Sequence, residues 1–154
     1  MLQRLRGPVY KIRSSGKSVA GPLLARLNEF VLARSDQSCV KYEIKSLTVE
    51  HILPQNVKLG SGWERDFPDE DERQQLVHRL GNLMLLSAKK NAGASDHDFP
   101  HKTTYYFTNK NGAQAHVNNI PLTDKIAKLD KWTMTELKTN QDEHINYAKQ
   151  CWEL

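Results

Sequence analysis

The chain has 154 residues, of which 38% are hydrophobic and 26% are charged, a composition typical of a single folded domain. No apolar run approaches the roughly 18 residues that a membrane-spanning helix needs, and no apolar segment follows the basic first residues as it would in a secretory signal. The two cysteines, Cys39 and Cys151, form no CxxC pair, which disfavours a structural zinc site and favours a reducing, cytoplasmic setting.

Positive charge is concentrated in the first part of the chain. Residues 1–41 hold eight lysines and arginines against two acids, and the whole chain has a net charge of +4 and a pI near 9.1. Such an excess suits a polyanionic partner such as nucleic acid. A basic, solvated surface without a partner explains the charge equally well, so the charge permits nucleic-acid binding without indicating it.

The first half of the chain predicts a leader, two helices and a short strand between them. Residues 1–18 are polar, basic and punctuated by Gly and Ser, so we interpret them as a leader or as the remnant of an upstream domain. Residues 19–35 carry apolar residues at helical spacing and predict the first helix. Residues 47–52, LTVEHI, predict the strand. Residues 66–80 predict the second helix, whose acidic first turn suits the positive end of the helix dipole.

The second half begins with another short strand and ends in a long helix. The sequence LMLLS at 83–87 predicts the strand, and a short helix is expected directly after it in 88–95. The following segment is ambiguous, and TTYYFT at 103–108 is compatible with a strand. The tail predicts a helix that opens with a capping box made by Thr133 and Glu136 and carries an apolar stripe.

An acid–histidine pair and two asparagines stand at the ends of the short elements. Glu50 and His51 close the first strand, in TVEHILPQ. Asn82 directly precedes the second strand, and Asn91 lies nine residues later in the short helix. Hydrolysis of a phosphodiester needs a base for the attacking water and positive charge at the scissile phosphate. An imidazole, with an ordinary pKa of about 6.5, supplies such a base, and carboxylate and amide oxygens suit Mg²⁺ or Mn²⁺.

These residues, in this order, resemble the HNH nuclease superfamily in its H-N-N form. EHILPQ and GNLMLLSAKKN are similar to the HNH domain of RNA-guided CRISPR nucleases, which also ends in Asn rather than His. A wider set, LTVEHILPQ, Trp63, HRLGNLMLLSAKKN, FPHK and a Trp-containing C-terminal helix, resembles the C-terminal HNH-like domain of GmrSD-type, modification-dependent restriction enzymes over residues 20–154. The resemblance implies an α+β fold, in which a ββα-metal (HNH) finger is embedded in a mostly helical domain spanning 19–154.

The resemblance also implies a role for each residue of the motif. Glu50 and Asn91 would hold Mg²⁺ or Mn²⁺, and His51 would activate the attacking water. Asn82 would not bind metal but would hold the loop and so orient the base. The commoner final His is replaced by Asn91, which leaves the identity of the metal open, and Asn91 also has an ordinary interpretation as a helix C-cap.

Four further residues are candidates for contacts with nucleic acid: His78, Lys89, Lys90 and Lys102. His78 belongs to HRLGN, the two adjacent lysines open the finger helix, and Lys102 matches the F..K of the GmrSD-type pattern. Contact with phosphate and plain solvation explain the lysines equally well. A structural role explains His78 equally well.

The function that this resemblance implies is a metal-dependent DNA endonuclease or nickase, the effector of a phage-defence system that acts on modified DNA. In the family such a domain usually follows a nucleotide-dependent sensor domain. No Walker-type GxxxxGK motif occurs here, so we expect the sensor elsewhere in the same protein or on a partner subunit. Two alternatives stay open: a non-catalytic module that binds DNA or a partner domain, and a ribonuclease.

Overall fold

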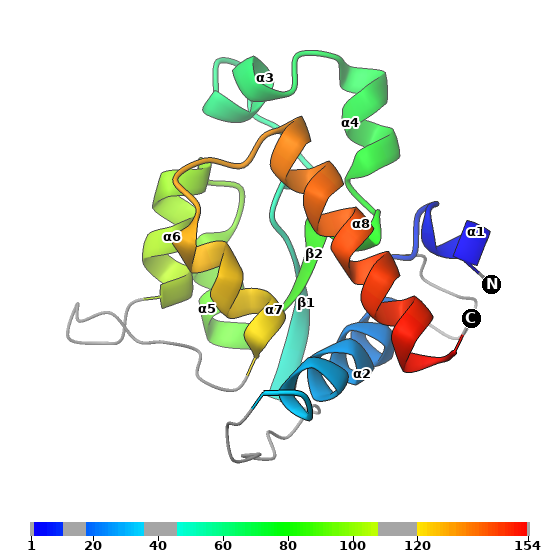
Figure 1. The fold of residues 1–154 in the computed structure, drawn as a ribbon. Helices are drawn as coiled ribbons and strands as arrows, with labels where there is room; N and C mark the ends of the chain where they lie inside the picture. The colour runs from blue at the N-terminus through cyan, green and yellow to red at the C-terminus, as the bar shows by residue number, and fades with distance from the viewer. Residues whose placement is uncertain (1, 11–17, 36–45, 108–119, 154) are drawn as a thin grey trace.

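A two-stranded antiparallel sheet lies at the centre of the domain, with helices packed on both of its faces (Figure 1). The computed structural model describes residues 2–10, 18–35, 46–107 and 120–153. In chain order the elements are α1 (Leu2–Leu5), α2 (Ala20–Leu32), β1 (Leu47–His51), α3 (Gly62–Asp66), α4 (Glu70–Leu76), η2 (Leu80–Asn82), β2 (Leu83–Ser87), α5 (Ala88–Ala94), α6 (Phe99–Phe107), α7 (Pro121–Asp124), η3 (Lys125–Lys128) and α8 (Met134–Cys151).

The order strand, strand, helix that the sequence predicts is present in β1, β2 and α5. The strands pair with Glu50 opposite Met84 and His51 opposite Leu83. The helix α5 starts directly after β2, where the Ser87 side chain accepts a hydrogen bond from the Lys90 amide. The predicted α+β class is confirmed, because a small sheet is set among a majority of helices.

The strand β2 is buried on both faces and separates two apolar clusters. Met84 and Leu86 point into a cluster built around Trp63 and Trp132. Leu83 and Leu85 point the other way, into a cluster formed with α2 and α8. Successive side chains of a strand alternate between faces, so a strand covered on both sides needs the continuous apolar run LMLL rather than an alternating one.

Three predicted helices are confirmed with adjusted ends. The first is α2, which lies inside 19–35. The second is shorter than 66–80, because the chain forms α3, breaks at Phe67 and begins α4 only after Asp69, whose carboxylate accepts from the Glu72 amide. The third is α8, which opens with the predicted capping box and buries the apolar stripe Leu137, Ile145 and Ala148 against both clusters.

The predicted strand at 103–108 is wrong over its described residues, which belong to helix α6, Phe99–Phe107. Residue 108 lies outside the described residues. Pro100 does not prevent this helix, because it is the second residue of α6, where no intrahelical N–H bond is lost and proline is tolerated. Lys102 and Tyr106 are therefore one helical turn apart and share a face, and both are buried.

Residues 2–10 pack onto the rest of the domain. Leu5 and Val9 are buried in the cluster shared with α2 and α8. The Val9 and Tyr10 amides donate to the His78 carbonyl at 2.9 and 3.2 Å. Residues 11–17 lie outside the described residues. The segment 2–10 is thus part of the folded unit next to His78.

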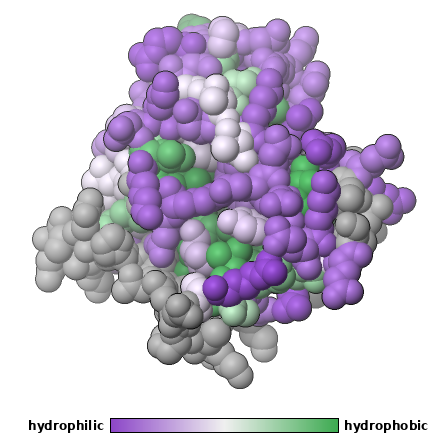
Figure 2. Space-filling view, in the orientation of Figure 1, coloured by the Kyte–Doolittle hydropathy of each residue, from purple (hydrophilic) through white to green (hydrophobic). Residues whose placement is uncertain are grey.

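Hydrophilic side chains cover most of the face shown in Figure 2, with apolar residues visible only in small areas between them. Half of the eight basic residues in 1–41 lie outside the described residues, and the described ones, Arg4, Arg6, Arg26 and Arg34, are exposed. Two of these pair with acids, Arg6 with Asp142 and Arg26 with Glu29. Within the described ranges, no helix is both long and apolar enough to cross a membrane.

The close approach of η2 to α8 depends on Gly81. A Cβ atom there would lie 2.7 Å from the backbone of α8 at Leu137 and Gln141. We expect Gly81→Ala to lower the free energy of unfolding by about 2 kcal/mol, because the helix must move to make room. Urea denaturation measures this loss. Gly21→Ala is the matched control, since its Cβ would lie at an ordinary 3.6 Å from Val49 and should leave stability unchanged or raised. Equal stability of both variants would contradict this account.

Candidate active site

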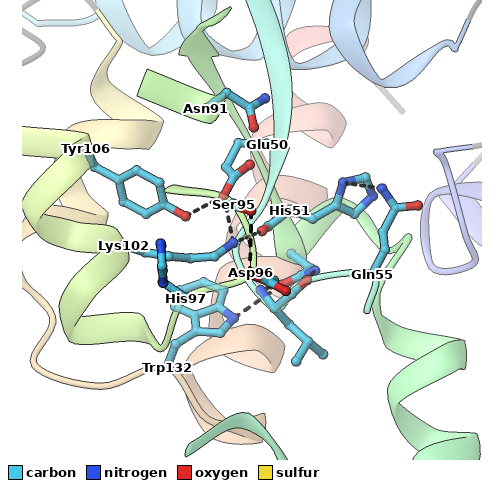
Figure 3. A network of polar contacts seen from close by, with 12 residues as sticks. Glu50, His51, Gln55, Asn91, Ser95, Asp96, His97, Lys102, Tyr106 and Trp132 are labelled. Atoms are coloured by element: carbon cyan, nitrogen blue, oxygen red, sulfur yellow. Dashed lines mark hydrogen bonds and ion pairs between the residues drawn. The ribbon is translucent and has the colours of Figure 1, made fainter. Parts of the chain in front are cut away.

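A pocket of about 280 Å³ opens at the end of β1. It brings together residues from β1, α5, the loop after each of them, and the N-terminal segment. Its polar lining includes Tyr10, Glu50, His51, Gln55, Asn91 and Asp96. Three of these, Glu50, His51 and Asn91, are motif residues singled out from the sequence, so the fold gathers them at one opening. Figure 3 shows the polar contacts around it.

The Glu50 carboxylate is held from the side of α6. Its Oε1 atom accepts from the Lys102 ammonium at 2.8 Å and from the Tyr106 hydroxyl at 2.6 Å (Figure 3). The Lys102 and Glu50 side chains are only 1% and 5% exposed. Burial lowers the pKa of Lys102, and Glu50 opposes that shift. Burial and the nearby carboxylate raise the pKa of Tyr106, so its hydroxyl stays protonated and donates a hydrogen bond to Glu50.

Lys102 also fixes the backbone of the neighbouring residue. Its Nζ atom donates to the His51 carbonyl at 2.7 Å, so one ammonium group binds a side chain and a main-chain atom of consecutive residues. We expected Lys102 to contact nucleic acid. Because it is fully buried and paired with Glu50, the structure places it inside the domain, where a phosphate does not reach it.

The His51 imidazole is buried beside the pocket and contacts two polar side chains. Its Nε2 atom lies 3.2 Å from His78 Nδ1, and its Nδ1 atom lies 3.5 Å from the Gln55 amide nitrogen. Burial, then the neighbouring His78, then Lys102 lower the pKa of His51 to about 3. The ring is therefore neutral at pH 7 and has one unprotonated nitrogen, as a proton acceptor requires.

Asn91 lies within α5 and turns its amide oxygen toward the pocket. Its amide nitrogen donates to Thr48 Oγ1 at 2.9 Å and to the Val49 carbonyl at 3.1 Å, which joins α5 to β1. Figure 3 shows the amide oxygen on the side of Glu50. The alternative interpretation of Asn91 as a helix C-cap does not hold, because α5 continues to Ala94 and its cap is Ser95.

Asn82 is fully buried and is occupied by contacts to the chain that follows β1. Its side chain bonds the Leu53 amide and carbonyl, at 2.8 and 2.9 Å, and the Val77 carbonyl at 2.9 Å. The Trp132 indole donates to it at 3.3 Å. Asn82 therefore presents no exposed atom to the pocket, and its contacts hold residues 52–53 in place.

The remaining nucleic-acid candidates differ in exposure. Lys89 is exposed on α5. Lys90 is half-buried, with its ammonium group 2.6 Å from the Tyr106 carbonyl, and burial lowers its pKa. His78 is half-buried and faces His51 rather than open solvent. Lys89 is thus the candidate best placed to meet a phosphate.

The pocket fits a divalent cation bound mainly by oxygen and water. Among the residues that the structure describes, no three His, Cys, Asp or Glu side chains gather as a closed metal cage. Glu50 and Asn91 are a carboxylate and an amide, and an open site with one or two protein oxygens is the pattern of Mg²⁺. Asp96 also lines the pocket, but its carboxylate pairs with Lys58 at 2.9 Å. The donor set therefore suits a hard cation rather than zinc.

Sequence reasoning missed Tyr10, Gln55, Asp96 and Tyr106. A signal existed for Tyr106: had the segment been read as a helix, Phe99, Lys102 and Tyr106 would have formed one face at spacings of three and four. Tyr10, by contrast, reaches the pocket from a distant part of the chain, and no local pattern indicates it.

The buried ion pair provides a test of this arrangement. We expect Lys102→Met to lower the free energy of unfolding by about 3–5 kcal/mol, because Glu50 would keep a buried charge without its partner. Adding Glu50→Gln in the same chain should recover most of that loss. Arg26→Met, which breaks an exposed pair, is the control and should cost less than about 1 kcal/mol. Wild-type stability of Lys102→Met in chemical denaturation would refute the role given to this pair.

Comparison with known families assigns the chain to one of them. A search of curated proteins found no match. A family model described as "GmrSD restriction endonucleases, C-terminal domain" matches residues 11–146, which is most of the chain and includes Glu50, His51, Asn82 and Asn91. The resemblance to GmrSD-type C-terminal domains that was inferred from the sequence is thereby confirmed. The chain belongs to the family of GmrSD restriction endonuclease C-terminal domains.

Proposed function

We propose that this domain is a metal-dependent DNA endonuclease or nickase, in which β1, β2 and α5 form an HNH-type ββα-metal finger. The family is one of restriction endonuclease domains, so a nuclease function is the starting point. One observation carries the proposal: a single pocket is lined by a carboxylate, a neutral imidazole and an amide oxygen, from Glu50, His51 and Asn91. These groups match the needs of phosphodiester hydrolysis.

In this proposal Glu50 and Asn91 hold the cation, Mg²⁺ or Mn²⁺. The bound cation would supply positive charge at the scissile phosphate and at the leaving oxygen. Lys102 and Tyr106 both bind Oε1 of Glu50, which fixes the orientation of the carboxylate and leaves its second oxygen without a bond from the described residues, for use by the cation. Asn91 is fixed in the same way, because its amide nitrogen is tied to β1 while its oxygen has no partner within the described part of the chain.

His51 acts as the base that takes the proton of the attacking water. A pKa of about 3 keeps the ring neutral at pH 7 but also makes it a weak base. A phosphate bound in the pocket adds negative charge beside the ring, which raises the pKa of an imidazole, whereas the bound cation shifts that pKa in the opposite direction.

DNA is the proposed substrate and phage defence the proposed setting. The family name supports restriction, and Lys89 on α5 offers an exposed positive charge for the backbone. Recognition of modified DNA is assigned to a nucleotide-dependent sensor, in the same protein or on a partner subunit. The catalytic residues would then be supplied by this chain, and target choice by the sensor.

A non-catalytic binding module is the rival function, and one observation favours it. Lys102 already places a positive charge on Glu50, at 2.8 Å. If the ammonium group neutralises the carboxylate completely, Glu50 binds a metal cation less tightly. Binding and scission can be separated experimentally, because contacts from lysine and arginine to phosphate weaken with salt but need no metal.

We expect the chain to nick supercoiled plasmid in Mg²⁺ or Mn²⁺, and EDTA to abolish nicking while leaving salt-sensitive DNA binding intact. His51→Ala should reduce nicking by about 10²-fold or more, the usual contribution of a general base. Glu50→Gln should bind DNA but fail to nick it. Gel electrophoresis of the plasmid and fluorescence anisotropy of a labelled duplex measure the two properties.

His101→Ala is the matched control, since His101 is an exposed histidine outside the pocket lining. It should nick plasmid like the wild type. Nicking by His51→Ala at the wild-type rate, or nicking that persists in EDTA, would exclude the mechanism. Salt-sensitive binding with no nicking at high protein and Mn²⁺ would favour the binding module. Cleavage of RNA but not DNA would indicate a ribonuclease.

A further inference from the structure

Two histidines from distant parts of the chain meet ring to ring beside the pocket. His51 ends β1, and His78 lies between α4 and η2. Their rings are nearly perpendicular, at 77°, with centroids 5.2 Å apart. The Nε2 atom of His51 lies 3.2 Å from the Nδ1 atom of His78. One of these two nitrogens must carry the proton of the hydrogen bond.

The orientation of the Gln55 amide is the basis for assigning that proton. The structure turns the amide nitrogen of Gln55, rather than its oxygen, toward His51 Nδ1 at 3.5 Å, and an amide nitrogen donates, so we assign Nδ1 as the acceptor without a proton. A neutral imidazole has one N–H, which then belongs to Nε2. His51 therefore donates to Nδ1 of His78, and His78 carries its own proton on Nε2. The opposite tautomer would set two donors against each other at Gln55.

The N-terminal segment holds this pair of rings from one side. Tyr10 packs edge-on against His51, with centroids 4.5 Å apart, and stacks on His78, with centroids 5.6 Å apart. The Val9 and Tyr10 amides both donate to the His78 carbonyl, and Pro8 forms a bridge with Arg79. His78 is thus fixed at its backbone and at its ring. Tyr10 lies just before the residues matched by the family model, 11–146.

We infer that His78 is a positioning residue, which with Tyr10 fixes His51 as the Nε2–H tautomer and so places the reactive lone pair on Nδ1. This inference rests on the proposed nuclease function for its consequence, though not for the tautomer itself. In the reaction, the Gln55 amide gives up its long contact with Nδ1 of His51, the proton of water passes to Nδ1, and the hydroxyl oxygen forms the new P–O bond. The bond to the leaving oxygen breaks, that oxygen takes a proton from solvent, and His51 afterwards returns its proton to solvent. Throughout, the Nε2–H group stays bonded to His78.

The tautomer is measured directly by long-range ¹H–¹⁵N correlation spectra of the full chain, labelled with ¹⁵N-histidine, at pH 7. We expect the Nε2–H pattern for His51 and for His78. His78→Leu removes the acceptor, so His51 should show a mixture of tautomers and nicking should fall about 10-fold or more, as for other residues that orient a functional histidine. His78→Asn keeps an oxygen acceptor at the position of Nδ1 and should retain both the tautomer and most of the nicking.

Tyr10→Phe keeps the ring that packs against His51 and should retain the tautomer. Amide spectra of each variant establish that it is folded. The inference is overturned if His51 of the wild type shows the Nδ1–H pattern, or if folded His78→Leu keeps both the tautomer and the nicking rate. If the wild-type chain does not nick at all, the nuclease function fails, but the spectra still decide the tautomer and the role of His78 in setting it.

Discussion

The ammonium group of Lys102 joins the end of β1 to α6, and the arrangement of the pocket depends on this contact. It binds the Glu50 carboxylate and the His51 carbonyl together, in a place where both charged side chains are removed from water. A buried ion pair is weak support for stability, because an apolar pair of the same size is often as good. The contribution of the Lys102–Glu50 pair is positional. It fixes the Glu50 carboxylate and the backbone of His51, so that both residues face the pocket at the end of β1.

The two side chains at the strand end point to opposite faces and are held by separate parts of the chain. Glu50, opposite Met84, is held by Lys102 and Tyr106 from α6, whereas His51, opposite Leu83, is held by His78. The edge of a two-stranded sheet is narrow enough for both to reach the same pocket. The strands β1 and β2 together with α5 would therefore leave both side chains without support, and the surrounding helices and the N-terminal segment supply it.

Local sequence signals account for what could be predicted, and contacts between distant residues account for the rest. The run LMLLS, the strand-favouring Thr48 and Val49 in LTVEHI, and the Thr133–Glu136 box each reflect a neighbourhood of a few residues, and each predicted its element. The burial of Lys102 was not predictable in this way, because a lysine is ordinarily a surface residue and only the fold brings Glu50 to it. Likewise, Tyr10 and His51 are far apart in sequence, so only the folded structure shows their contact.

The central claim is that a carboxylate oriented by a buried lysine retains an oxygen for a catalytic cation. Anomalous diffraction from crystals of this chain grown with Mn²⁺ tests it most directly. We expect one ion in the pocket at the end of β1, within about 2.0–2.3 Å of a Glu50 oxygen and of the Asn91 amide oxygen. Lys102 should remain on the other oxygen of Glu50. An ion held by histidines, an ion elsewhere on the domain, or a pocket without an ion at saturating Mn²⁺ would contradict the claim.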